Sequence, residues 1–164
     1  MLSDDPLDRW TLDDLFNWSA GTLRRSARPI RDYRTDRPVK FRDREYRNTR
    51  MPAHAYGIYW KEAAKQLRSK EFDTWLHRGL SDSDLVEVLE EMITSSAGSE
   101  GDVWDAKLTT RVCSVMDPEG PLKYQGLTAM LDGMGYALSA AVEAGDKDTI
   151  NLVIELIQKG IASD

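Results

Sequence analysis

The residues best suited to binding chemistry are ten arginines between positions 24 and 50. A guanidinium group is planar, pairs with a phosphate or carboxylate through two parallel hydrogen bonds, and stacks on aromatic rings and bases. Tyr33, Phe41 and Tyr46 are interleaved with these arginines. The candidate binding residues of this segment are Arg24, Arg25, Arg28, Arg31, Arg34, Arg37, Arg42, Arg44, Arg47 and Arg50.

Acidic residues alternate with several of these arginines, as in Arg31-Asp32, Asp36-Arg37 and the Arg-Asp-Arg-Glu run at 42–45. Such mixed-sign runs are typical of ion-pair networks with protein partners, whereas a segment dedicated to nucleic acid tends to exclude acids. The pattern therefore favours a protein contact. Binding of RNA or DNA phosphates stays open as the alternative.

The net charge of −6 hides a gradient along the chain. Residues 24–50 carry eleven basic and four acidic side chains, a net charge of +7, whereas residues 71–164 carry six and eighteen, a net charge of −12. An acidic protein can therefore still hold a polyanion-binding segment. The basic segment could also lie against the acidic body of its own or a neighbouring chain.

Sequence motifs for common kinds of catalysis are absent. There is no Gly-rich phosphate-binding loop and no Gly-x-Ser-x-Gly nucleophile motif. Of the two histidines, His77 follows Asp73 by four residues, a spacing that on a helix usually gives a surface interaction. Cys113 is expected to be a buried small hydrophobe, and the acidic residues near Glu90 are expected to be solvated. We predict no enzymatic activity, no cofactor and no metal ion.

Arg47 and His54 form an Arg-x₆-His spacing. This spacing resembles the Arg-x(4–6)-His pattern of small helical ribonucleases of the HEPN type. The resemblance implies that the two residues line an RNA-cleaving groove between two subunits. That family places the motif at a helix start, whereas here Pro52 lies between the two residues and the flanks are predicted to be extended. A small ribonuclease is therefore the third hypothesis for function.

Composition bounds the class of protein. The chain has 164 residues, of which 41% are hydrophobic, and this suits one domain plus an arm. Its single cysteine rules out an intrachain disulfide and fits a reducing compartment. The acidic start lacks the pattern of a secretory signal, and no apolar run approaches the ~18 residues that span a membrane. We expect a cytoplasmic location, or one within a virion, and no membrane partner.

Hydrophobic spacing predicts an all-α protein, a small helical domain of about five to seven helices with an extended Arg-rich N-terminal arm. Residues 1–50 are predicted to hold a short helix followed by the arm, because Pro29 and Pro38 disfavour a continuous helix. Residues 51–164 form the helical domain. The predicted pieces of this domain are helices within 52–79, 81–93 and 103–116, a linker near 95–102, and a C-terminal helical hairpin over 122–160, with 122–144 as its first helix.

The tryptophans divide into two groups. Trp60, Trp75 and Trp104 have helical spacings and are predicted to lie in the core, whereas Trp10 and Trp18, next to the basic arm, are candidate interface anchors. Together these features predict a non-enzymatic subunit or adaptor of a larger assembly, docking on other copies or other proteins through the Trp helix and the Arg arm. A viral or phage structural component fits this description.

Overall fold

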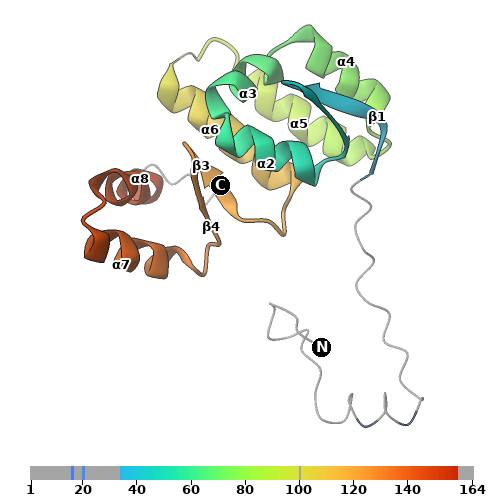
Figure 1. Ribbon diagram of the computed structural model, residues 1–164. Helices are drawn as coiled ribbons and strands as arrows, with labels where there is room; N and C mark the ends of the chain where they lie inside the picture. Colours follow the sequence, from blue (N-terminus) through green and yellow to red (C-terminus); the bar gives the residue numbers. More distant parts are fainter. Residues whose placement is uncertain (1–15, 17–19, 21–33, 100, 159–164) are drawn as a thin grey trace. The chain divides into compact units, whose positions relative to one another are not determined.

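A computed structural model of the chain describes Phe16, Ala20, residues 34–99 and residues 101–158. The chain divides into Met1–Asp32 and Tyr33–Asp164, and nearly all described residues belong to the second unit. These residues are predominantly helical, with seven helices and two small two-stranded antiparallel sheets (Figure 1). Within them, every helix falls short of the length and apolar content that crossing a bilayer requires.

In chain order the elements are β1 (Arg34–Phe41), β2 (Arg44–Asn48), α2 (Arg50–Ile58), α3 (Trp60–Leu67), α4 (Lys70–Gly79), α5 (Ser83–Ser95), α6 (Asp102–Met116), β3 (Leu122–Tyr124), β4 (Leu127–Ala129), α7 (Met134–Ala144) and α8 (Lys147–Gln158).

The prediction of an arm that extends from the body is wrong for residues 34–50. β1 and β2 form an antiparallel hairpin, with a register irregularity between Arg34 and Val39 where Pro38 cannot donate a backbone hydrogen bond. Val39 and Phe41 alternate along β1 and are both buried. The Phe41 ring lies edge-on to the Tyr56 ring of α2, with centroids 4.8 Å apart. The hairpin is therefore part of the hydrophobic core.

The region 52–79, where the apolar stripe slips, contains three consecutive helices: α2, α3 and α4. α4 begins where the Ser69 side chain accepts a hydrogen bond from the Phe72 backbone N–H, an N-cap. α5 begins in the same way at Asp82, which accepts from Leu85 N–H. The slip in apolar spacing between Leu67 and Phe72 therefore coincides with the boundary between α3 and α4. The boundary between α2 and α3 at Tyr59 lies within the stripe from Tyr56 to Leu67 that predicts one continuous helix.

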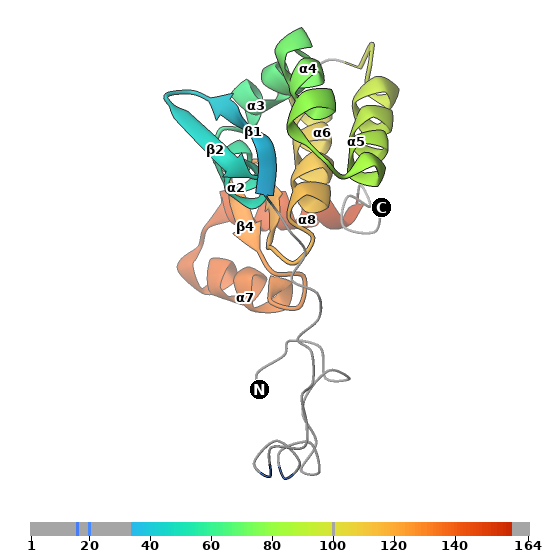
Figure 2. The same ribbon diagram turned by 90° about the vertical axis from the view of Figure 1, so that its right-hand side faces the viewer.

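α6 packs against α2, α3, α5 and β3 and so lies between two clusters of buried side chains (Figure 2). The larger cluster joins the β1–β2 hairpin to α2, α4, α5 and α6 through residues such as Phe41, Tyr56, Phe72, Leu89 and Val112. The smaller cluster joins α6 to the C-terminal elements through Ala106, Tyr124 and Leu156. This arrangement fixes the hairpin on one part of the body and α7–α8 on another.

The first part of the C-terminal segment also differs from prediction. Residues 122–129 form the β3–β4 hairpin, whereas a helix was predicted from residue 122. The turn residues Gln125 and Gly126 both have positive φ, 49° and 89°, as the tight turns of two-residue hairpins require. α7 and α8 do contact each other, and α7 ends at Gly145 in the left-handed conformation.

The tryptophan predictions have mixed outcomes. Trp75 is buried, and its indole N–H donates to the Arg37 carbonyl oxygen at 2.9 Å, which ties α4 to β1. Trp60 is half-buried against the smaller cluster. Trp104 is 49% exposed, so its prediction as a core residue is wrong. Trp10 and Trp18 lie outside the described residues.

Candidate protein-binding surfaces

The predicted binding arginines fall into two groups. Arg24, Arg25, Arg28 and Arg31 lie outside the described residues. The other six are all exposed on or next to the hairpin: Arg34 and Arg37 in β1, Arg42 in the turn, Arg44 and Arg47 in β2, and Arg50 at the start of α2. These six arginines, which are spread over 17 residues of the sequence, therefore lie together on or next to one hairpin.

Arg42 occupies the tip of the hairpin, in the left-handed region with φ of 53°. Its guanidinium carbon lies 3.8 Å from the centroid of the Tyr59 ring, a cation–π contact. Its Nε lies 3.4 Å from a carboxylate oxygen of Glu62 in α3. Two partners thus hold the Arg42 side chain over the end of α2, where one face of its guanidinium covers an aromatic ring.

A hollow of about 410 Å³ lies between the hairpin tip and α2. Three apolar side chains here are unusually exposed: Met51 at 53%, Ile58 at 50% and Tyr59 at 43%. Tyr, Met and Arg are enriched at protein interfaces, and a cluster of exposed apolar side chains marks a binding site more often than an isolated one does. We call Arg42, Arg44, Met51, Ile58 and Tyr59 the hairpin face.

His54 also lines this hollow, on the exposed side of α2. The flanks of this spacing are extended on the Arg47 side alone, because Pro52 lies in the first turn of α2, where a proline is tolerated. Arg47 lies in β2 and is exposed. The two residues of the Arg-x₆-His spacing are therefore divided between a strand and a helix.

Arg50 has a different role from the other hairpin arginines. Its Nε lies 2.9 Å from Oδ1 of Asp117, at the end of α6. The second oxygen of Asp117 lies 3.6 Å from the Nζ of Lys123, whose side chain is only 2% exposed. Arg50 therefore closes a buried ion-pair cluster of its own chain.

A second group of exposed apolar side chains lies on and beside α7 and α8, which sequence reasoning did not single out. Among the residues of α7, all of which are described, Ala141 alone is buried. Large apolar side chains are exposed on and beside these helices. We call them the C-terminal surface: Leu131, Tyr136, Val142, Ile154 and Ile157. The sequence does carry a signal, since apolar residues occur on more than one side of residues 134–144.

Comparison with known protein families, with curated proteins and with solved structures finds no match to this chain. Its function must therefore be argued from its own surfaces.

Cys113 is the one thiol of the chain and lies in the larger core cluster, 1% exposed. Its S–H donates to the Ala53 carbonyl oxygen at 3.2 Å. Burial raises the pKa of this thiol from 9.0 to about 12, since the thiolate would lose its hydration; nearby Lys123 lowers the pKa and Asp117 raises it by smaller effects. The thiol is therefore a poor nucleophile at neutral pH.

We expect this raised pKa to appear as a loss of stability at alkaline pH. The unfolded chain loses the thiol proton near pH 9 and the folded chain near pH 12, so the stabilisation is complete below pH 9 and is lost between these values. The slope is at most about 1.4 kcal/mol per pH unit. Urea unfolding of the wild type and of Cys113→Ala should give a flatter alkaline decline for the variant. Equal slopes would contradict the assignment.

Proposed function

We propose that this protein is a non-enzymatic assembly subunit, and that the hairpin face of one copy binds the C-terminal surface of another. The observation that carries the proposal is that one chain has two groups of exposed apolar side chains, in regions of opposite net charge. Each surface alone resembles an interface, and the opposite charges of their regions would favour their contact. The remaining support comes from the charges, the composition of the hairpin face and the exposure of α7.

The charges of the two regions balance. Residues 34–50 contain seven basic and three acidic side chains, a net charge of +4. Residues 131–158 contain one basic and five acidic side chains, a net charge of −4. Complementary charges steer encounter and fix the register of an interface, while the apolar side chains supply most of the affinity. A second copy of the chain therefore supplies the acidic, apolar partner that the hairpin face requires.

The exposure of α7 supports an occupant for the C-terminal surface. A helix of about eleven residues is marginal in water unless packing buries one of its faces. α7 has Tyr136 81% exposed and Val142 59% exposed, and contacts α8 on one side. A partner that covers these side chains would stabilise both helices, at about 25 cal/mol for each Å² of apolar surface removed from water.

Ion pairs on the hairpin favour protein over nucleic acid as the partner. Lys40 Nζ lies 3.1 Å from a carboxylate oxygen of Glu45, and Arg42 pairs with Glu62. These carboxylates would repel a phosphate backbone. Nucleic-acid binding is the alternative proposal, supported by the common exposure of Arg34, Arg37, Arg44 and Arg47 on the hairpin. The N-terminal segment with Trp10, Trp18 and the remaining arginines is proposed to add to either contact.

We expect the wild type to self-associate in a salt-dependent way. Light scattering after size exclusion should give a mass above the 18.6 kDa monomer at low salt, rising with concentration, and a lower mass at high salt. The double variant Arg44→Glu with Ile58→Ser should remain a monomer, because it reverses one charge and removes one apolar side chain of the hairpin face.

A matched control carries the same kinds of change elsewhere: Lys65→Glu in α3 with Val88→Ser in α5, both at exposed positions. It should assemble like the wild type. A wild type that stays monomeric without nucleic acid at every concentration would refute the proposal. A peak whose ultraviolet absorbance shows nucleic acid that high salt removes would favour the alternative, and degradation of added RNA that His54→Ala abolishes would favour the ribonuclease.

A further inference from the structure

Three potential metal ligands meet between α4 and α5. Asp73 and His77 lie one turn apart on α4, and Glu90 lies on α5. The Nε2 atom of His77 is 2.6 Å from Oε1 of Glu90 and 3.9 Å from Oδ1 of Asp73. One ligand atom from each residue lies within 4.8 Å of the other two. Sequence reasoning considered the Asp73–His77 pair alone, because nothing in the spacing reveals that Glu90 faces it.

We propose that Asp73, His77 and Glu90 form a binding site for a divalent transition-metal ion of the zinc class. Zinc binds histidine nitrogen and carboxylate oxygen at about 2.0–2.2 Å, which places the atoms of a tetrahedral shell about 3.4 Å apart. The two observed separations from the imidazole nitrogen lie on either side of that value. The three side chains are 37–63% exposed, so rotamer changes can bring them onto one ion.

The backbone that carries these ligands is held by the core. Leu76, next to His77, and Leu89, next to Glu90, are each 1% exposed or less. α4 and α5 both belong to the larger core cluster through these residues. The ligand-bearing helices therefore keep their spacing while the exposed side chains adjust, which is the preorganisation that a metal site needs.

The donor set selects the class of ion. Two carboxylates and a neutral imidazole give a charge of −2, which matches a divalent cation. An imidazole ligand favours zinc and its transition-metal neighbours, whereas magnesium and calcium prefer oxygen ligands throughout. The imidazole thus argues against an adventitious calcium or magnesium site.

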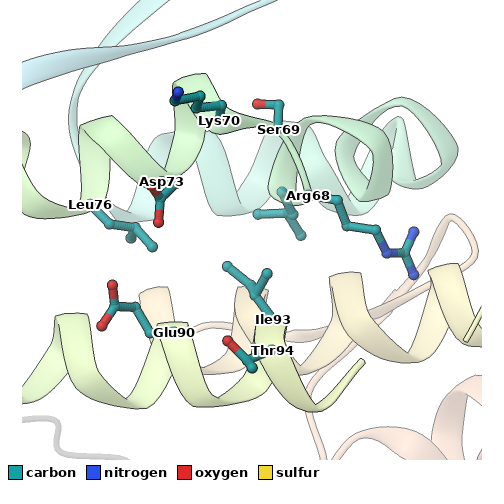
Figure 3. A pocket seen from close by; sticks show the side chains of 9 residues that line it. Arg68, Ser69, Lys70, Asp73, Leu76, Glu90, Ile93 and Thr94 are labelled. Carbon is teal, nitrogen blue, oxygen red and sulfur yellow. The ribbon is translucent and has the colours of Figure 1, made fainter. Parts of the chain in front are cut away.

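A pocket of about 520 Å³ adjoins the cluster, and Asp73 and Glu90 face each other across it (Figure 3). Leu67, Leu76 and Ile93 line its apolar part. A metal with three protein ligands keeps a fourth position for water or another small ligand, and this pocket provides the room. The proposed metal site therefore has one coordination position that is open to a small ligand.

Two cationic residues also line the pocket. Arg68 is engaged elsewhere, since its guanidinium donates to Asp105 at 2.6 Å and to the Ser99 carbonyl oxygen at 3.2 Å. Lys70 is exposed and points away from Asp73 and Glu90 in Figure 3. Neither side chain lies between Asp73 and Glu90 in Figure 3.

Titration of the chelator-treated full chain with zinc, at high salt to suppress association, tests this proposal. The wild type should bind one ion saturably and gain thermal stability. His77→Gln and Glu90→Gln should bind at least about tenfold more weakly. Cobalt should give the visible absorption of a four-coordinate ion in the wild type and lose it in His77→Gln.

The other histidine of the chain supplies the control. His54 is exposed on α2 and is not one of the three proposed ligands. His54→Gln should bind zinc as the wild type does. The proposal is overturned if the wild type shows no saturable binding, if His77→Gln binds equally well, or if His54→Gln weakens binding as much.

Discussion

Asp117→Ala is expected to lower the free energy of unfolding by about 3–5 kcal/mol, because it leaves a buried ammonium group without its counter-ion. Lys123 is 2% exposed, and its Nζ contacts the Pro121 carbonyl oxygen at 3.1 Å in addition to Asp117. The only other ion-pair partner of Asp117 that the described contacts show is Arg50, which is 47% exposed and can be hydrated instead. The loss of stability in Asp117→Ala therefore comes mainly from the buried charge of Lys123, which is left without a counter-ion. Chemical denaturation followed by circular dichroism measures it.

The paired replacement Asp117→Leu with Lys123→Met supplies the control. Removing both charges of a buried pair is often neutral or stabilising, so this double variant should be more stable than Asp117→Ala. The Lys123 chain packs against Gly57 of α2, where an added Cβ would come within 2.6 Å of its Cδ, and the unbranched methionine fits the same path. If Asp117→Ala loses less than about 1 kcal/mol, the cluster does not hold a charged Lys123.

Phe41→Ala should lower the free energy of unfolding by about 3–5 kcal/mol, the usual cost of deleting a buried aromatic ring. Phe41 is 5% exposed and packs edge-on against Tyr56 in the core cluster, so its loss opens a cavity between β1 and α2. The control is Arg44→Ala, an exposed change three residues along the hairpin that should stay within about 0.5 kcal/mol of the wild type. A small effect of Phe41→Ala would mean that the hairpin is an independent arm.

Helices with regular apolar spacing could be predicted from the sequence. Residues 103–116 were predicted as a helix, and α6 is Asp102–Met116. The slip in apolar spacing between Leu67 and Phe72 predicts a kink or two helices in sequence, and the structure has a new helix there, capped by Ser69. In such segments local propensity and core packing favour the same structure.

Both hairpins escaped prediction for a common reason. In β1 just two residues, Val39 and Phe41, carry the alternating pattern, and arginines surround them. Two alternating apolar residues are too few to distinguish a strand from an extended arm. In residues 122–131, Leu127 and Leu131 are also at helical spacing, although the Gln125-Gly126 turn ends that option.

The candidate sites depend on contacts between elements that are distant in sequence. The hairpin face joins Arg42 of the turn to Tyr59 beyond α2, and the metal cluster joins His77 to Glu90 across two helices. Residue types predicted arginine as the binding side chain and predicted no metal ligand. Geometry adds the apolar partners of the arginines and the third metal ligand, the carboxylate of Glu90, which spacing alone does not reveal.

The proposed contact joins two different surfaces of the same chain. Such a head-to-tail contact gives rings or open filaments rather than closed two-fold dimers. Each copy then has one hairpin face and one C-terminal surface to offer, and a copy that lacks either can only end a chain.

A mixing experiment tests this central claim most directly. One variant lacks the hairpin face (Arg44→Glu with Ile58→Ser), and the other lacks the C-terminal surface (Tyr136→Ser with Glu143→Lys). Each alone should have the 18.6 kDa monomer mass in light scattering, and an equimolar mixture should give a species of twice that mass, because one intact copy of each surface remains. A mixture that stays monomeric, or a variant that assembles alone, would contradict head-to-tail assembly through these two surfaces.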